Sequence, residues 1–92
     1  MEFEFNEEKN NQLFQERGVT FYKVIDSINE NGILLNIEHT NKEKYPNQKM
    51  FIVNIDNYAY CVPYEIIGDK YFLKTIFPNR KFKYLIEGHK NG

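Results

Sequence analysis

The spacing of apolar residues changes once along this chain, near Asn31-Gly32, and this change restricts the fold more than any other feature. In residues 21–28, apolar side chains recur at the three- and four-residue spacing of one helix face. In residues 33–37 the spacing becomes two, which is typical of a strand. Hydrophobic residues make up 41% of the 92-residue chain, enough for one packed core. We therefore predict a single α+β domain over residues 1–92.

Capping residues and turns set the other boundaries. Asn6 and Thr20 are expected to cap helices at 7–17 and 21–31, and Asp56-Asn57 to form a two-residue hairpin turn. The short turns predict two N-terminal helices, a four-stranded antiparallel sheet and a short C-terminal helix, while residues 2–5 could add an edge strand. The remaining predicted elements are strands at 33–38, 49–55, 58–64 and 70–77, a helix at 80–87 and a frayed tail at 88–92.

Local chemistry gives three expectations about burial. Leu13 and Phe14 should lie on the buried side of the first helix. Pro63 has no amide hydrogen to donate, so it indicates a bulge or a free edge within its strand. Cys61 lies between apolar neighbours in the same strand and is expected to be a packed core residue rather than a nucleophile.

Charge is distributed unevenly although the net charge is only −1. Residues 1–69 contain six Lys/Arg and twelve Asp/Glu, a net of −6, whereas residues 70–92 contain six Lys/Arg and one Glu, a net of +5. Such asymmetry suits a surface that faces an anionic partner. A solvated basic tail would give the same count, so both interpretations stay open.

Cysteine use and the N-terminal residues bear on the compartment. The chain has one cysteine, whereas a secreted domain of this size usually has several disulfides. Residues 1–8 lack the basic start and apolar run of a signal peptide, and no apolar stretch approaches the ~18 residues that span a bilayer. We expect a cytoplasmic protein with no membrane partner.

The common signatures of enzymes and cofactor sites do not occur. There is no glycine-rich phosphate loop, nucleophile elbow or zinc-type Cys/His set. His39 and His89 could hold a metal only with carboxylates that the fold would have to supply. We predict no metal and no cofactor.

Three residues are candidates for catalysis. Lys74 should share a strand face with Phe72 and Ile76, where a lysine is either held for use or simply deters aggregation at an edge. Arg80 follows Pro78-Asn79 at a predicted helix start, where amides and a guanidinium favour phosphate, although a solvated basic turn has the same sequence. His39 lies at the junction of a strand and a loop and is either a proton carrier or a structural histidine.

Four further residues are candidates for binding. Lys9 and Arg17 lie two turns apart on the first helix and could share a face, or both could be ordinary solvated charges. Lys81 belongs to the same basic turn as Arg80. Tyr45 could stack on a nucleobase, as could Tyr58, Tyr60 and Tyr64, although most of these tyrosines are expected to belong to the core or to a sheet face.

Three segments, two near the N-terminus and one near the C-terminus, resemble those of BrnT-type toxins. Residues 5–10 read Phe-Asn-Glu-Glu-Lys-Asn, and residues 17–21 read Arg-Gly-Val-Thr-Phe, the order seen at the start of that family. Residues 72–81 read Phe-Leu-Lys-Thr-Ile-Phe-Pro-Asn-Arg-Lys, which is similar to the family's last strand with its single basic residue and closing arginine. The resemblance extends over residues 3–84.

The resemblance implies a fold like that of RelE-type ribonucleases and a toxin of a type II toxin–antitoxin system. Such a toxin is similar to metal-independent endoribonucleases that inhibit translation by cutting RNA, messenger RNA in particular, either free or on the ribosome. Its implied partners are RNA and a cognate antitoxin, and binding of operator DNA by the antitoxin complex is implied as well. Lys9, Arg17, Lys74 and Arg80 match the family's basic positions, and His39 stands where related chains often have a histidine.

A ribonuclease of this kind needs no metal because the 2′-hydroxyl of RNA is the nucleophile. Lys74 and Arg80 would neutralise charge at phosphorus, and His39 or a tyrosine would move protons. The alternative is a non-catalytic module that binds RNA, the ribosome or a protein through the same basic face.

Overall fold

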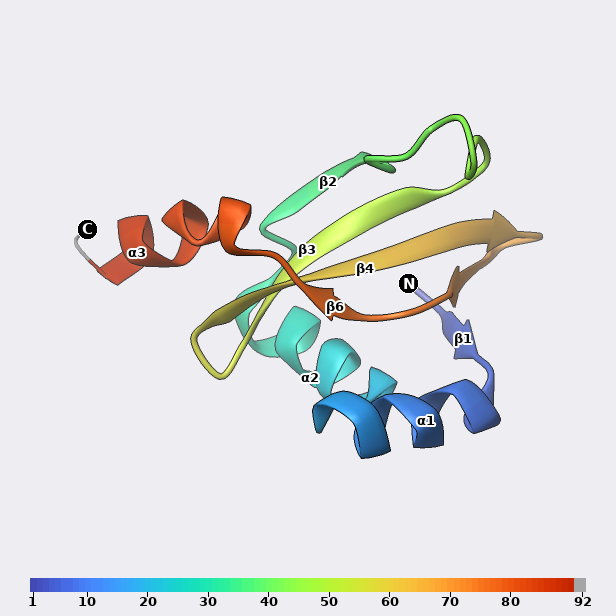
Figure 1. The fold of residues 1–92 in the computed structure, drawn as a ribbon, viewed down its shortest axis with the longest axis horizontal. Coiled ribbons are helices and arrows are strands. Elements are labelled where there is room, and N and C mark those ends of the chain that lie inside the picture. The colour runs from blue at the N-terminus through green and yellow to red at the C-terminus, as the bar shows by residue number, and fades with distance from the viewer. Residues whose placement is uncertain (91–92) are drawn as a thin grey trace.

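The computed structural model describes residues 1–90, with side chains through Glu87, and has the predicted α+β order of elements (Figure 1). The C-terminal helix continues to Lys90, so the tail predicted at 88–92 is helical up to that residue, and 91–92 lie outside the described part. The elements are β1 (Phe3–Phe5), α1 (Glu7–Arg17), α2 (Phe21–Asn31), β2 (Leu35–Glu38), β3 (Lys49–Ile55), β4 (Tyr58–Ile67), β5 (Lys70–Leu73), β6 (Phe77–Pro78), the 3-10 helix η1 (Arg80–Phe82) and α3 (Tyr84–Lys90).

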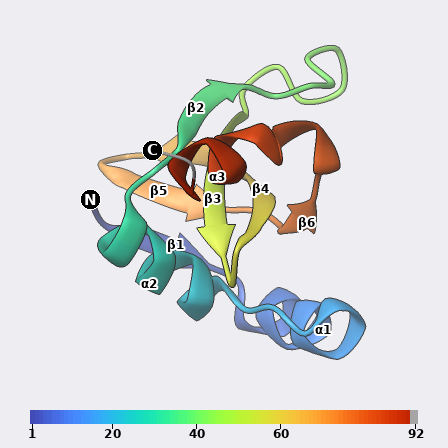
Figure 2. The same cartoon turned by 90° about the vertical axis from the view of Figure 1, so that its left-hand side faces the viewer.

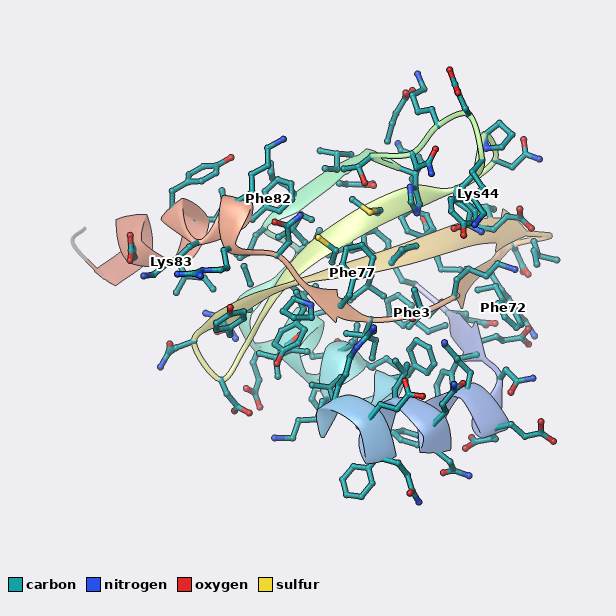
Figure 3. The ribbon with its side chains drawn as sticks, in the orientation of Figure 1. Phe3, Lys44, Phe72, Phe77, Phe82 and Lys83 are labelled. Carbon is teal, nitrogen blue, oxygen red and sulfur yellow. The ribbon has the colours of Figure 1, made fainter. Side chains whose placement is uncertain are left out.

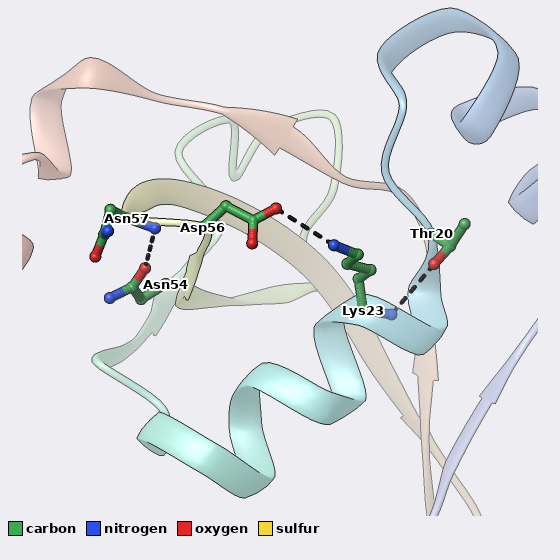
Figure 4. Close-up of polar contacts among 5 residues, drawn as sticks. All are labelled: Thr20, Lys23, Asn54, Asp56 and Asn57. Atoms are coloured by element: carbon green, nitrogen blue, oxygen red, sulfur yellow. Dashed lines mark hydrogen bonds and ion pairs between the residues drawn. The ribbon is translucent and has the colours of Figure 1, made fainter.

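Both N-terminal helices begin and end where the capping residues predict. The Asn6 side chain accepts a hydrogen bond from the Lys9 amide at 2.9 Å, and Gly18 ends α1 with a φ of 69°. Thr20 accepts a hydrogen bond from the Lys23 amide at the start of α2 (Figure 4). The prediction for Phe14 is wrong, since its side chain is 61% exposed. Helix α1 buries only a narrow stripe, and the adjacent position falls outside it.

The sheet is mixed and larger than the predicted four-stranded antiparallel sheet. Its main path is β1-β5-β4-β3-β2, with β6 added beside β4. The predicted edge strand does form, but it pairs in parallel with β5, with Phe3 opposite Tyr71. No turn connects those strands, so local signals could not reveal the pairing. The Asp56-Asn57 turn is confirmed, because both residues have the positive φ, 53° and 65°, of a two-residue hairpin.

Pro63 interrupts the strand predicted at 70–77. The Lys74 amide donates to the Pro63 carbonyl at 2.8 Å, but proline has no N–H to return to Lys74. Pairing with β4 resumes only at Phe77, opposite Cys61, so three residues face two and act as a bulge. The predicted shared face of Lys74 and Ile76 is therefore wrong, because the extra residue turns Ile76 into the core.

The two sheet faces carry separate cores (Figure 2). On the face covered by α2, the rings of Phe51 and Tyr64 stack with centroids 4.0 Å apart. On the opposite face, Phe82 from η1 and Ile86 from α3 pack in a core cluster with side chains of β3 and β4, including Cys61. Because η1 and α3 cover only part of this second face, the region next to Pro63 remains available for a cleft.

One buried polar contact joins α1 to α2. The Asn10 side chain is nearly inaccessible, and its Oδ1 accepts a hydrogen bond from the Phe21 amide at 2.7 Å. This bond satisfies one of the free amides at the start of α2.

We expect Asn10→Ala to lower the free energy of unfolding by about 1–3 kcal/mol, because the buried Phe21 amide loses its acceptor. Asn11→Ala, on the exposed side of the same helix, should change it by less than about 0.5 kcal/mol. Urea unfolding followed by circular dichroism measures both. Equal effects of the two substitutions would contradict a role for this hydrogen bond.

Candidate functional site

A cleft of about 370 Å³ opens beside the interruption at Pro63, and we term it the His39 cleft. It brings together four of the seven residues singled out from the sequence: Lys9 from α1, His39 from the end of β2, Tyr45 from the following loop, and Lys74 from the segment after β5. The residues around it are Lys9, His39, Tyr45, Gln48, Pro63, Lys74, Thr75 and Phe77.

Two lysines give the His39 cleft its charge. The Lys74 ammonium lies 4.7 Å from the centre of the Phe72 ring, a cation–π contact. In the described part of the chain, neither Lys9 nor Lys74 forms an ion pair, and no acidic residue lines the cleft. The arrangement therefore attracts an anion.

His39 is held in one orientation. Its side chain is 8% exposed, and its ring lies 4.6 Å from that of Tyr45. Nδ1 accepts a hydrogen bond from the Asn41 amide at 2.9 Å, so the neutral ring carries its proton on Nε2. Burial lowers the pKa of His39, which keeps the ring neutral at pH 7. In this state Nε2 carries the hydrogen that the ring can donate to a ligand, and His39 can take up a second proton only if the Asn41 bond opens.

Arg17 and Tyr45 hold other parts of the cleft in position. The Arg17 guanidinium donates to the Ile76 carbonyl at 2.5 Å and so anchors the segment between β5 and β6. Tyr45 packs on His39, and the Lys44 ammonium lies 5.4 Å from the centre of the Tyr45 ring. Figure 3 shows Lys44, Phe72 and Phe77 near this region.

Arg80 does not lie in the His39 cleft. It lines a second cleft of about 220 Å³, which we term the Arg80 cleft, together with Tyr58 and Lys83. The helix that it begins is a single 3-10 turn of three residues, too short to supply the expected anion-binding amides. Lys81 lines neither cleft, and its ammonium lies 6.0 Å from the centre of the Phe82 ring.

The sequence analysis missed several residues of both clefts. Gln48, Thr75 and Phe77 line the His39 cleft because of strand register and the bulge, which no local pattern reveals. Lys83 lines the Arg80 cleft, and its three-residue spacing from Arg80 was a usable signal for this position. Tyr58, which the sequence offers as a candidate for stacking on a base, lines the same cleft.

Cys61 is a core residue, as predicted. It is fully buried, and desolvation raises the pKa of its thiol to about 11, against a smaller opposing effect of a hydrogen bond with Asn79. A thiol with this pKa is not a nucleophile at neutral pH. In the described part of the chain, no three His, Cys, Asp or Glu side chains are grouped so as to hold a metal ion.

Comparison with known proteins adds no assignment. No known protein family matches the chain, and no curated protein or solved structure matches it. None of the helices in the described residues is long and apolar enough to cross a membrane. The similarity to BrnT-type toxins thus rests on the quoted sequence motifs alone.

The pKa of His39 should lie below its ordinary value of 6.5, with the proton of the neutral ring on Nε2. Because the unfolded chain then binds this proton more readily, the free energy of unfolding should fall as the pH drops below about 6.5. NMR titration of the imidazole carbons and nitrogens measures both properties, with the urea-unfolded chain as reference. A pKa at or above 6.5, or a proton on Nδ1 of the neutral ring, would contradict this geometry.

Proposed function

We propose that this chain is a metal-independent endoribonuclease of the toxin type, and that the His39 cleft holds the phosphodiester that is cut. The observation that carries the proposal is the meeting of Lys9, Lys74 and a neutral His39 in one cleft with no acidic residue among the described residues around it. These groups come from three separate parts of the chain.

The charge of the cleft favours a phosphate ligand. The two ammonium groups would neutralise the non-bridging oxygens, and the Nε2–H of His39 would donate a hydrogen bond to one of them. A substrate that carries its own nucleophile suits this site, because His39 is not free to accept a proton at Nδ1. RNA, with its 2′-hydroxyl, is such a substrate.

The reaction can be written with these groups alone. The 2′-oxygen bonds to phosphorus while the bond from phosphorus to the 5′-oxygen breaks. The proton of the 2′-hydroxyl passes to water, and the leaving 5′-oxygen takes a proton from the Lys74 ammonium, which water then restores. The products are a 2′,3′-cyclic phosphate and a 5′-hydroxyl. Arg80, in its separate cleft, has no part in this step.

The toxin assignment rests on the sequence resemblance and forms part of the same proposal. It includes a RelE-like fold, action in the cytoplasm, and a cognate antitoxin that holds the enzyme inactive and brings operator DNA into the complex. An antitoxin that neutralised the enzyme would have to deny RNA access to the His39 cleft.

One observation favours a second candidate function. The Nδ1 of His39 is occupied by the Asn41 amide, so no side chain in the described cleft is a free base at pH 7. A non-catalytic RNA-binding module would use the same two lysines and the same hydrogen-bond donor without cutting the strand.

We expect the purified chain to cleave total RNA in the presence of a chelator, and Lys74→Ala and His39→Ala each to lower the rate by about 10²–10³, because each removes stabilisation of the charge on phosphorus. Gel analysis of single-turnover reactions measures the rates.

Lys70→Ala is the matched control, since it removes one positive charge that Glu4 already partners. It should leave the rate within about twofold of the unmutated chain. Binding without cleavage would select the module instead of the enzyme, and undiminished cleavage by Lys74→Ala would contradict the proposed site.

A further inference from the structure

The Arg80 cleft lies at the hairpin end of β4 and is separate from the His39 cleft. Asn57 and Tyr58 border it on one side, with Ala59 next along β4. The Asn79 amide donates to the Ala59 carbonyl at 3.2 Å, and this bond fixes the chain that carries Arg80 beside the strand. Lys83 completes the rim (Figure 3).

The chemistry of the Arg80 cleft combines an aromatic ring with two cations. Tyr58 is 44% exposed, so part of its ring is available for stacking. Arg80 forms no ion pair among the described residues, whereas Lys83 pairs with Glu87 at 3.2 Å with both groups exposed and exchangeable. Asp56, near the rim in sequence, is engaged by Lys23 at 3.3 Å (Figure 4).

This combination suits a nucleotide. A planar base can stack on a tyrosine ring, while a guanidinium and an ammonium bind the attached phosphate. A simple anion would use the two cations but leave the exposed ring of Tyr58 and the apolar surface at Ala59 without a function.

The same two neighbouring segments, β4 and residues 77–79, contribute to both clefts. Phe77 lines the His39 cleft and Asn79 the Arg80 cleft, and along β4 the corresponding residues are Pro63 and Ala59. Four residues of strand span about 13 Å. A stacked strand of nucleic acid advances about 3.4 Å per nucleotide, so about four stacked nucleotides, or fewer extended ones, cover this distance.

We propose that the Arg80 cleft is a nucleotide subsite that binds a second position of the same single RNA strand whose phosphodiester occupies the His39 cleft. This inference rests on the proposed RNA ligand and specifies the length of RNA that the protein recognises. A strand that reaches both clefts binds more tightly than a dinucleotide that fills one. Tyr58 supplies the stacking surface, and Arg80 supplies the phosphate contact.

The test compares a dinucleotide with an octanucleotide, both of 2′-O-methyl RNA, which lacks the nucleophile and cannot be cut. Fluorescence anisotropy at constant salt measures binding. We expect Arg80→Ala and Tyr58→Ala each to weaken octanucleotide binding about tenfold and to leave dinucleotide binding unchanged. Tyr58→Phe keeps the ring and should bind like the unmutated chain, and Lys70→Ala again controls for loss of one charge.

The outcomes separate the two proposals. Octanucleotide binding that depends on Lys74 but not on Arg80 or Tyr58 would overturn the subsite and leave the proposed function standing. Equal affinity for the two lengths, or an equal loss for both in Arg80→Ala, would also overturn the subsite. Failure of the unmutated chain to bind either probe would overturn the proposed RNA ligand and the subsite with it.

Discussion

The missing amide hydrogen of Pro63 is the constraint on which the candidate site depends. Pro63 accepts a hydrogen bond from Lys74 but cannot return one, so the ladder between β4 and β5 stops there. Residues 74–76 then lie opposite only two residues of β4, 62–63, before β6 begins. The extra residue sends Ile76 into the core and leaves Lys74 and Phe77 beside the open part of the sheet, where the His39 cleft forms.

The rest of the site consists of groups held by neighbours rather than free to move. The Asn41 amide and the Tyr45 ring orient His39, and Arg17 anchors the segment after Lys74 through a backbone carbonyl. The positive charge of residues 70–92 is divided between two clefts, with Lys74 in one and Arg80 in the other. A long anionic strand can use both clefts at once, whereas a small anion can use only one.

Short-range chemistry in the sequence predicted elements better than it predicted their contacts. The Thr20 cap, the Asp56-Asn57 turn and the irregularity at Pro63 each depend on a few adjacent residues, and the structure has all three. The parallel pairing of β1 with β5 and the exposure of Phe14 depend on packing across the chain. The sheet predicted as antiparallel is therefore mixed, and the predicted burial of Phe14 is wrong. The sequence named four residues of the His39 cleft and missed others that strand register brings there. It also placed Arg80 with them, because only the register of β6 shows that Arg80 lies elsewhere.

The central claim is that the His39 cleft is where this chain binds an RNA backbone. A titration of the nitrogen-15-labelled chain with an octanucleotide of 2′-O-methyl RNA, followed by amide NMR, tests it most directly. The account predicts salt-sensitive shifts at Lys9, at His39 and in residues 74–77, because these surround the cleft or carry its cations. Shifts confined to the acidic surface of α2 around Asp26 and Glu30, with none at the cleft, would contradict it.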